Sequence, residues 1–261
     1  MTSPSLSWAR PRPDRRAAFG QIVLNEARLT RRQPASLIGG IVFPVVLLVI
    51  FGAMPSFRQP AAELGGLTPL DVYVPILIVL SLGLLTLFSL PMPLTSYREL
   101  GVLRRLSTTP VPPWWLLAAQ GVVQLCVALT GIVILLVTSV TVYGTLVPKS
   151  PGALMLSIAL TAAALFPMGL LIASVAKTAT GASVIGRLVF FPMIFFAGLW
   201  WPRELMPGAL QAVSDYTPLG AAAEAIQDSM QGQFPPVAPL AVLAAYAVLF
   251  GFLAKRLFRW E

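Results

Sequence analysis

Long apolar runs separated by short polar segments dominate the chain. The runs span about 36–54, 72–94, 114–142, 152–176, 182–200 and 236–254. A helix needs roughly 20 mostly apolar residues to cross the hydrocarbon core of a bilayer, and each run approaches or exceeds that length. The runs lack the alternation of a barrel strand, and lipid offers no partner for unpaired backbone groups. The pattern predicts an all-α membrane protein, with a six-helix transmembrane domain over residues 36–261 and a basic cytoplasmic tail over residues 1–35.

The composition supports lipid as the solvent. Hydrophobic residues make up 57% of the chain and charged residues only 11%, whereas soluble domains carry about 25% charged residues. The chain has no histidine and one cysteine. These counts exclude histidine acid–base chemistry, a metal cluster of His and Cys ligands, and an internal disulfide.

The net charge of +8 could suggest a nucleic-acid partner, but its distribution favours a role in membrane topology. If the N-terminus is inside, fifteen of the 18 lysines and arginines fall in inner segments. Cytoplasmic loops carry such an excess of Lys and Arg. We therefore expect no nucleic-acid partner, and we expect a multi-pass membrane protein with both termini in the cytoplasm.

Residues 14–33 precede the first apolar run and predict a helix in the headgroup layer. Phe19, Ile22 and Val23 share one helical face, and arginines cluster at both ends of the segment. Such a helix can place its arginines against anionic lipid. Glu26 falls near the apolar face and weakens the pattern, so a basic tail without fixed structure is the alternative. The residues assigned to the interfacial helix are Arg15, Arg16, Phe19, Ile22 and Val23.

The segment 201–235 is the longest outer segment on this topology. It predicts one helix over about 203–214 and a second that starts after Thr217, a suitable N-cap with Pro218 at the first helical position. The alanine-rich run 221–226 is interrupted by charge and is too polar to span. Two arrangements remain open: the second helix dips into the outer leaflet and returns, or the segment forms a helical hairpin on the surface.

The segment "YRELGVLRRLSTTPVPP", residues 97–113, is the only substantial cytoplasmic loop between spans. Leu100, Leu103 and Leu106 recur at helical spacing among charged residues, and Pro110 stops a helix. A loop that only connects two spans does not need exposed leucines, whereas a docking surface for a soluble partner uses them. The segment therefore predicts a short surface helix that binds such a partner.

Two stretches of the sequence resemble the type-2 ABC exporter permeases. The first is "RELGVLRRLSTTPVPPWWLL", and the second is "FAGLWWPRELMPGALQAVSDYTPLGAAAEAI" at 196–226. Together with the six-run layout and the basic N-terminal helix, the resemblance covers nearly the whole chain. The subtype is most similar to the daunorubicin-type drug and antibiotic resistance exporters. Pro91-Met92-Pro93 departs from the family pattern and leaves the end of the second span open.

The resemblance implies that residues 97–110 are a coupling helix that docks in a cleft of a separate ATPase. The docking residues would be Arg98, Glu99, Leu100, Gly101, Leu103, Arg104, Arg105, Leu106, Thr109 and Pro110. It also implies two permease chains, expected to be a homodimer rather than a heterodimer, and two ATPase chains. The substrate path would lie between the permeases along the second and fifth spans. Candidate path residues are Phe88, Arg187, Phe191 and Phe195.

An ATP-driven machine needs a phosphate-binding loop, and the sequence has no G-x-x-x-x-G-K-[ST] motif. We therefore expect no cofactor on this chain, with ATP and Mg bound by the partner ATPase. The predicted function is that of a permease subunit, not an enzyme. It would export a hydrophobic or amphipathic substrate such as a drug, a lipid or a lipid-linked glycan.

A membrane-embedded lipid-modifying enzyme, or a scramblase without an ATPase partner, is the alternative. Such an enzyme would need acidic or polar groups clustered near one interface. The ten acidic residues are scattered instead, and none falls deep in a predicted span, which also disfavours a proton-coupled carrier. A scramblase would leave the charged segment 97–113 unexplained.

Overall fold

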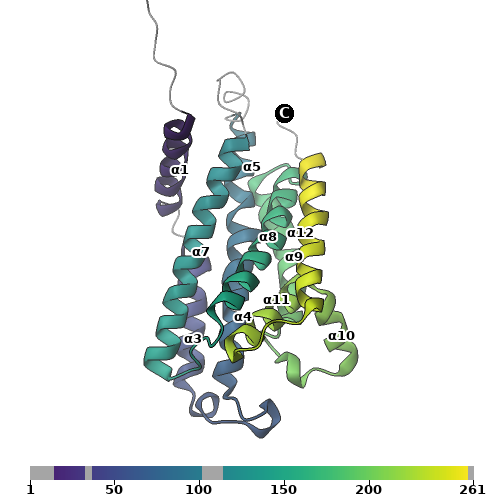
Figure 1. Ribbon diagram of the computed structural model, residues 1–261. Helices are drawn as coiled ribbons and strands as arrows, with labels where there is room; N and C mark the ends of the chain where they lie inside the picture. The colour runs from purple at the N-terminus through teal and green to yellow at the C-terminus, as the bar shows by residue number, and fades with distance from the viewer. Residues whose placement is uncertain (1–14, 33–36, 102–113, 258–261) are drawn as a thin grey trace, which may run out of the picture.

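A computed structural model describes residues 15–32, 37–101 and 114–257, and that part of the chain is helical with no β-strand (Figure 1). The helices are α1 (Arg15–Arg31), η1 (Ile38–Val42), α3 (Phe43–Ala53), η2 (Pro55–Arg58), η3 (Ala62–Leu64), α4 (Pro69–Leu84), η4 (Leu85–Ser89), α5 (Pro91–Glu99), α7 (Trp114–Tyr143), α8 (Pro151–Val175), α9 (Ala179–Phe196), η5 (Arg203–Leu205), α10 (Gly208–Tyr216), α11 (Pro218–Gln231) and α12 (Val237–Leu257). The prediction of an all-helical chain is confirmed for these residues.

Within residues 15–32, 37–101 and 114–257, five helical stretches are long and apolar enough to cross a membrane. They are Pro69–Glu99, which joins α4, η4 and α5, and the helices α7, α8, α9 and α12. Five of the predicted spans therefore coincide with such helices, and the helix around the second, predicted at 72–94, extends from Pro69 to Glu99. The first apolar run forms the shorter helix Ile38–Ala53, and its role as a sixth span stays a prediction.

The continuous helix Pro69–Glu99 occupies the centre of the bundle, with α3 and α7 on one side and α8, α9 and α12 on the other (Figure 1). In its most apolar stretch 83% of the residues are buried, against 17–44% for the other four candidate spans. A helix that is apolar on most sides lies either in lipid or inside a protein, and here protein covers most of it. Helices α3, α7, α8, α9 and α11 pack against it, whereas α12 packs mainly on α8 and α11.

A capping box begins the central helix. The Thr68 hydroxyl accepts a hydrogen bond from the Asp71 N–H at 3.2 Å, and Asp71 Oδ2 accepts one from the Thr68 N–H at 3.1 Å. Pro69 follows at the first helical position, where its missing N–H has no cost. Asp71 Oδ1 also accepts the Leu146 N–H at 2.9 Å, which attaches the segment after α7 to the start of α4.

The π-helical turn η4 lies in the central helix directly before Pro91 and Pro93. A proline removes a helical donor, and its ring clashes with the carbonyl four residues earlier, which is Leu87 for Pro91 and Ser89 for Pro93. A wider turn over 85–89 relieves that clash. The sequence left the end of this span open; the structure shows that the helix continues through both prolines to Glu99.

A second π-helical turn, η1, precedes another proline in the same way. Pro44 removes the donor for the carbonyl of Gly40, which lies four residues earlier. The hydroxyl of Ser81 on α4 donates a hydrogen bond to that carbonyl instead. A backbone acceptor freed by a proline thus fastens the first apolar run to the central helix.

Helix α11 is buried among α4, α8 and α12, whereas α10 is largely exposed. Ala221, Ala222 and Ala223 are completely buried. Thr217 is the N-cap and Pro218 the first helical residue, as the sequence predicts. The whole segment is therefore not a plain surface hairpin, because its second helix packs inside the bundle. Insertion of that helix into the outer leaflet stays a prediction.

Arg203 forms ion pairs and a hydrogen bond near the start of α11. Its guanidinium contacts Asp215 at 2.5 Å and Glu224 at 2.8 Å, and it donates to the Gly220 carbonyl at 2.6 Å. The side chain is only 9% exposed, so two carboxylates balance a cation that is withdrawn from water. This group ties together η5, α10 and α11.

We define the basic end of the bundle as the end that carries α1, the last turn of α5, the 176–178 turn between α8 and α9, and the last turn of α12 (Figure 1). Exposed cations gather there, including Arg28, Arg31, Lys177 and Lys255. The far end carries η2, η3, α10 and α11. The charge asymmetry seen in the sequence is thus an asymmetry between two ends of one bundle.

Close packing at Gly169 gives a test of the central helix. A Cβ at this position would lie 2.1 Å from the Thr86 carbonyl oxygen in η4, whereas Gly251 on α12 has open space. Overpacking costs about 1–3 kcal/mol, while Gly→Ala in an unhindered helix gains about 1 kcal/mol. We expect Gly169→Ala to lower the Tm of the purified protein and Gly251→Ala to leave it unchanged or raise it. Equal melting temperatures would contradict this packing.

Candidate functional site

Three consecutive residues at the end of α5 bond to three different segments of the chain. Tyr97 contacts α1, Arg98 contacts the end of α8, and Glu99 contacts the start of α9. We call this group the Tyr97–Arg98–Glu99 triplet. It lies at the basic end, directly before the segment that the sequence predicts to dock a soluble partner.

Arg98 neutralises the carboxyl end of α8. Its guanidinium donates to the Ser174 carbonyl at 3.3 Å and to the Ala176 carbonyl. The last carbonyls of a helix have no intrahelical partner and carry the negative end of the helix dipole. A cation with several N–H donors therefore stabilises this position.

Glu99 places a negative charge at the amino end of α9, where the helix dipole is positive. Its Oε1 accepts the Ala179 N–H at 3.0 Å, and the Thr178 hydroxyl accepts the Gly181 N–H at 3.0 Å. Both contacts satisfy N–H groups that lack helical partners, and a carboxylate favours the positive end of the dipole. Arg98 and Glu99, two adjacent side chains of opposite charge, thus hydrogen-bond to the residues on either side of the 176–178 turn.

Tyr97 anchors α1 through a buried carboxylate. Its hydroxyl donates to Glu26 Oε1 at 3.1 Å, with Oε2 at 3.2 Å. Glu26 is only 5% exposed. Burial raises the pKa of the Glu26 carboxyl, and the hydrogen bond from Tyr97 opposes that shift. Glu26, which weakens the amphipathic pattern in the sequence, is therefore a point of attachment to α5.

The apolar face of α1 packs against α7. Phe19 meets Trp115 edge-on, with ring centroids 5.6 Å apart, and Val23 and Ala27 line a cavity of about 310 Å³ beside Cys126. Phe19, Ile22 and Val23 are partly buried. Arg15 and Arg16 form the start of α1. Placement of this helix in the headgroup layer stays a prediction.

The structure describes the first four of the predicted docking residues. Arg98 and Glu99 make the contacts above, Leu100 is 72% exposed, and Gly101 has a φ of +66° in the turn that ends the helix. Such a φ favours glycine because it lacks a Cβ. The other predicted docking residues, Leu103, Arg104, Arg105, Leu106, Thr109 and Pro110, lie outside the described residues.

The predicted path residues fall into two groups. Phe88 on η4 packs edge-on against the buried Phe190, with ring centroids 5.2 Å apart. Arg187 and Phe191 are exposed on α9, and Phe195 is partly buried. The structure thus places Phe88 between the central helix and α9, and the exposed pair on the outer face of α9. A substrate path along these residues stays a prediction.

Sequence reasoning missed the partners of the triplet. The carbonyls of Ser174 and Ala176 and the amide of Ala179 are backbone groups about 80 residues away along the chain. The only local signal was Thr178, whose hydroxyl caps α9 and lies three residues before Gly181. That pattern marks a helix start but does not reveal which carboxylate joins the cap.

The several long apolar helices indicate a multi-pass membrane protein. Comparison of the sequence with known families then gives its family. The profile of the "ABC-2 type transporter" family matches residues 17–231. The chain therefore belongs to the ABC-2 type transporter family. The chain is also similar to a Bacillus subtilis (strain 168) protein described as "Putative transport permease YvfS", with 27% identity over 153 residues. That match covers 56% of this chain and 60% of the relative.

Thermal unfolding offers a test of the Glu26–Tyr97 contact. Tyr97→Phe leaves the buried Glu26 without its donor, at a cost of about 1–3 kcal/mol. We therefore expect this variant to lower the Tm of the purified protein. Tyr143→Phe, which loses only a 3.4 Å bond to the Val49 carbonyl at the far end, is the control and should leave the Tm nearly unchanged. Equal melting temperatures for all three proteins would show that the contact does not stabilise the attachment of α1.

Proposed function

We propose that this chain is the permease subunit of an ATP-driven exporter in which a separate ATPase docks at the basic end. The observation that supports this most directly is the grip of Arg98 and Glu99 on the 176–178 turn. A push on residues 97–110 would reach α9 through these two contacts. The relative described as a transport permease supports the same function.

The energy source is expected to be a different polypeptide. The chain has no phosphate-binding loop and only three lysines, so ATP and Mg would bind to the partner ATPase. We propose a complex of two ATPase subunits and two permease chains, with a homodimer of this chain as the simplest arrangement. This chain would perform no chemical reaction itself.

The proposed orientation places the basic end in the cytoplasm of a bacterial cell. Arg28, Arg31, Lys177 and Lys255 would then face the cytoplasmic leaflet and the ATPase, in agreement with the positive-inside rule. Both termini would be cytoplasmic. The far end, with the exposed aromatics Trp200 and Trp201, would lie at the outer interface, where Trp is enriched.

The central helix and α9 would carry the motion into the membrane. Phe88 on the first contacts Phe190 on the second, and Gly186 on α9 approaches the Leu87 carbonyl so closely that a Cβ would lie 2.4 Å away. A displacement of one helix would therefore displace the other. We propose that Phe88, Arg187, Phe191 and Phe195 border the path of the substrate.

The substrate class follows from the character of these surfaces. Phe191 and Leu188 are exposed on α9 together with Arg187. Aromatic and aliphatic side chains with one cation suit a hydrophobic or amphipathic molecule. We propose a drug, a lipid or a lipid-linked glycan, with the daunorubicin-type resistance exporters as the nearest functional model.

Purification of the tagged chain from its native membrane in mild detergent would test the complex. We expect a P-loop ATPase subunit to copurify near one to one and the eluate to hydrolyse ATP, with stimulation by hydrophobic drugs or lipids from a screening panel. Recovery of this chain alone, without hydrolysis and without a partner after gentle crosslinking, would support a lipid-modifying enzyme or a scramblase instead.

The same complex would test the triplet. Arg98→Ala and Glu99→Ala remove the grip on the 176–178 turn but leave residues 103–110 available to the ATPase. We expect ATP hydrolysis to continue while substrate transport falls about tenfold, because two charge-assisted contacts are worth roughly 1.5–3 kcal/mol each. Glu63→Ala, an exposed carboxylate at the far end, should leave both activities unchanged. Normal transport by both triplet variants would refute the coupling role.

A further inference from the structure

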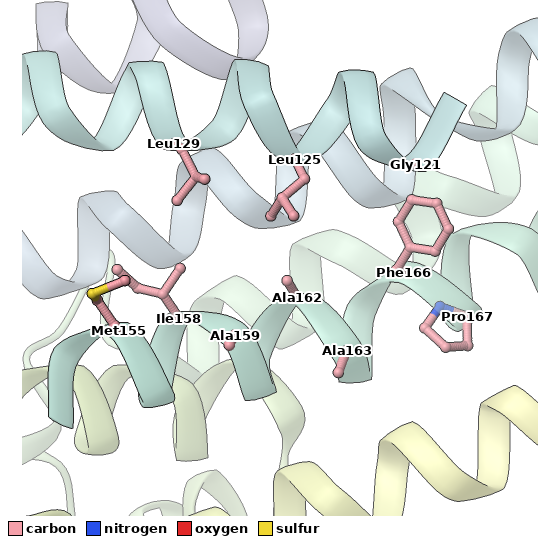
Figure 2. A pocket seen from close by; sticks show the side chains of 10 residues that line it. All are labelled: Gly121, Leu125, Leu129, Met155, Ile158, Ala159, Ala162, Ala163, Phe166 and Pro167. Atoms are coloured by element: carbon pink, nitrogen blue, oxygen red, sulfur yellow. The ribbon is translucent and has the colours of Figure 1, made fainter. Parts of the chain in front are cut away.

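An apolar groove runs between α7 and α8 (Figure 2), with a volume of about 520 Å³. The lining is apolar throughout: Gly121, Leu125 and Leu129 from α7, and Met155, Ile158, Ala159, Ala162, Ala163, Phe166 and Pro167 from α8. The groove exists because three of the α8 residues that line it are alanines, whose side chains are too short to reach α7. At one end Phe166 closes on α7, where a Cβ at Gly121 would lie 2.5 Å from its ring.

The groove lies along the middle of α8. Met155 and Pro167 mark its extent, and twelve residues of helix rise about 18 Å. Pro167 lies eight residues, or about 12 Å, before the basic end of α8. Both α7 and α8 are candidate membrane spans, and half of the hydrocarbon core is about 15 Å thick. An acyl chain that enters at the basic end would therefore reach the part of the groove next to Pro167.

A cation lies where this groove approaches the basic end. A second cavity of about 330 Å³ is lined by Trp114, Leu117, Leu170, Gly251, Ala254 and Lys255, and it shares Pro167 with the groove. Lys255 is exposed on the last turn of α12 and Trp114 on the first turn of α7. Within the described residues, the ion pairs involve Arg203 and not Lys255. Tryptophan and lysine at helix ends are the side chains that meet lipid headgroups.

We propose that this surface is the binding site of one anionic phospholipid. One acyl chain lies in the α7–α8 groove, and the headgroup phosphate lies in the second cavity beside Lys255. Charge complementarity selects an anionic headgroup over a zwitterionic one, because a cation near the membrane surface is worth about 1 kcal/mol toward anionic lipid. The site requires only membrane insertion, so it stands or falls independently of the proposed transport function.

Native mass spectrometry of the full chain released from nanodiscs tests the site. The nanodiscs contain equal amounts of phosphatidylglycerol and phosphatidylethanolamine. We expect one phosphatidylglycerol to remain bound to the wild-type protein. Ala162→Phe fills the groove, since Ala162 faces α7 between the two helices (Figure 2), and this variant should lose the bound lipid. Ala245→Phe, at an exposed alanine on α12 that does not line the groove, should retain it.

The headgroup contact is tested separately at an exposed residue whose replacement does not endanger folding. Lys255→Gln should reduce the preference for phosphatidylglycerol over phosphatidylethanolamine about fivefold. Lys177→Gln, an exposed lysine at the same end of the bundle, should keep the preference. Equal lipid retention by the two phenylalanine variants, or an unchanged preference in Lys255→Gln, would overturn the proposal.

Discussion

The burial of the continuous helix Pro69–Glu99 is the constraint on which the rest of the structure depends. Most of its apolar surface is covered by protein rather than left to lipid, and α3, α7, α8, α9 and α11 pack against it. Its wide π-helical turn passes the carbonyls of Thr86 and Leu87 close to Gly169 on α8 and Gly186 on α9. These contacts leave little room for independent motion. A displacement of the central helix at the basic end would therefore also displace α8 and α9.

The Tyr97–Arg98–Glu99 triplet extends that connection to the basic end. Two antiparallel helices, α8 and α9, meet at a short turn, so a negative helix end and a positive helix end lie side by side. An arginine followed directly by a glutamate matches this pair of ends, while Tyr97 holds α1. The charged residues that interrupt the apolar pattern at this point thus have structural partners within the chain. Family membership and these contacts are the basis of our proposal that an ATPase moves this permease.

The sequence was sufficient for the features that depend on local pattern. The apolar runs located five helices that are long and apolar enough to span a membrane, and Thr217 with Pro218 located the start of α11. Features that depend on distant contacts could not be predicted. Glu26 was read as a flaw in an amphipathic face because its partner, Tyr97, lies 71 residues away. The helix beyond Pro91 was uncertain because a π-helical turn that accommodates a proline depends on packing as well as on composition.

The central claim is that the last turn of α5 and the start of α9 move as one unit. Spin labels at Leu100→Cys and Leu188→Cys, two exposed positions, in a Cys126→Ser background and diluted with unlabelled chain, would measure the distance between these helices by electron paramagnetic resonance. The account predicts one narrow distance distribution that broadens when Arg98→Ala and Glu99→Ala are added. A distribution of the same width with and without the two substitutions would contradict it.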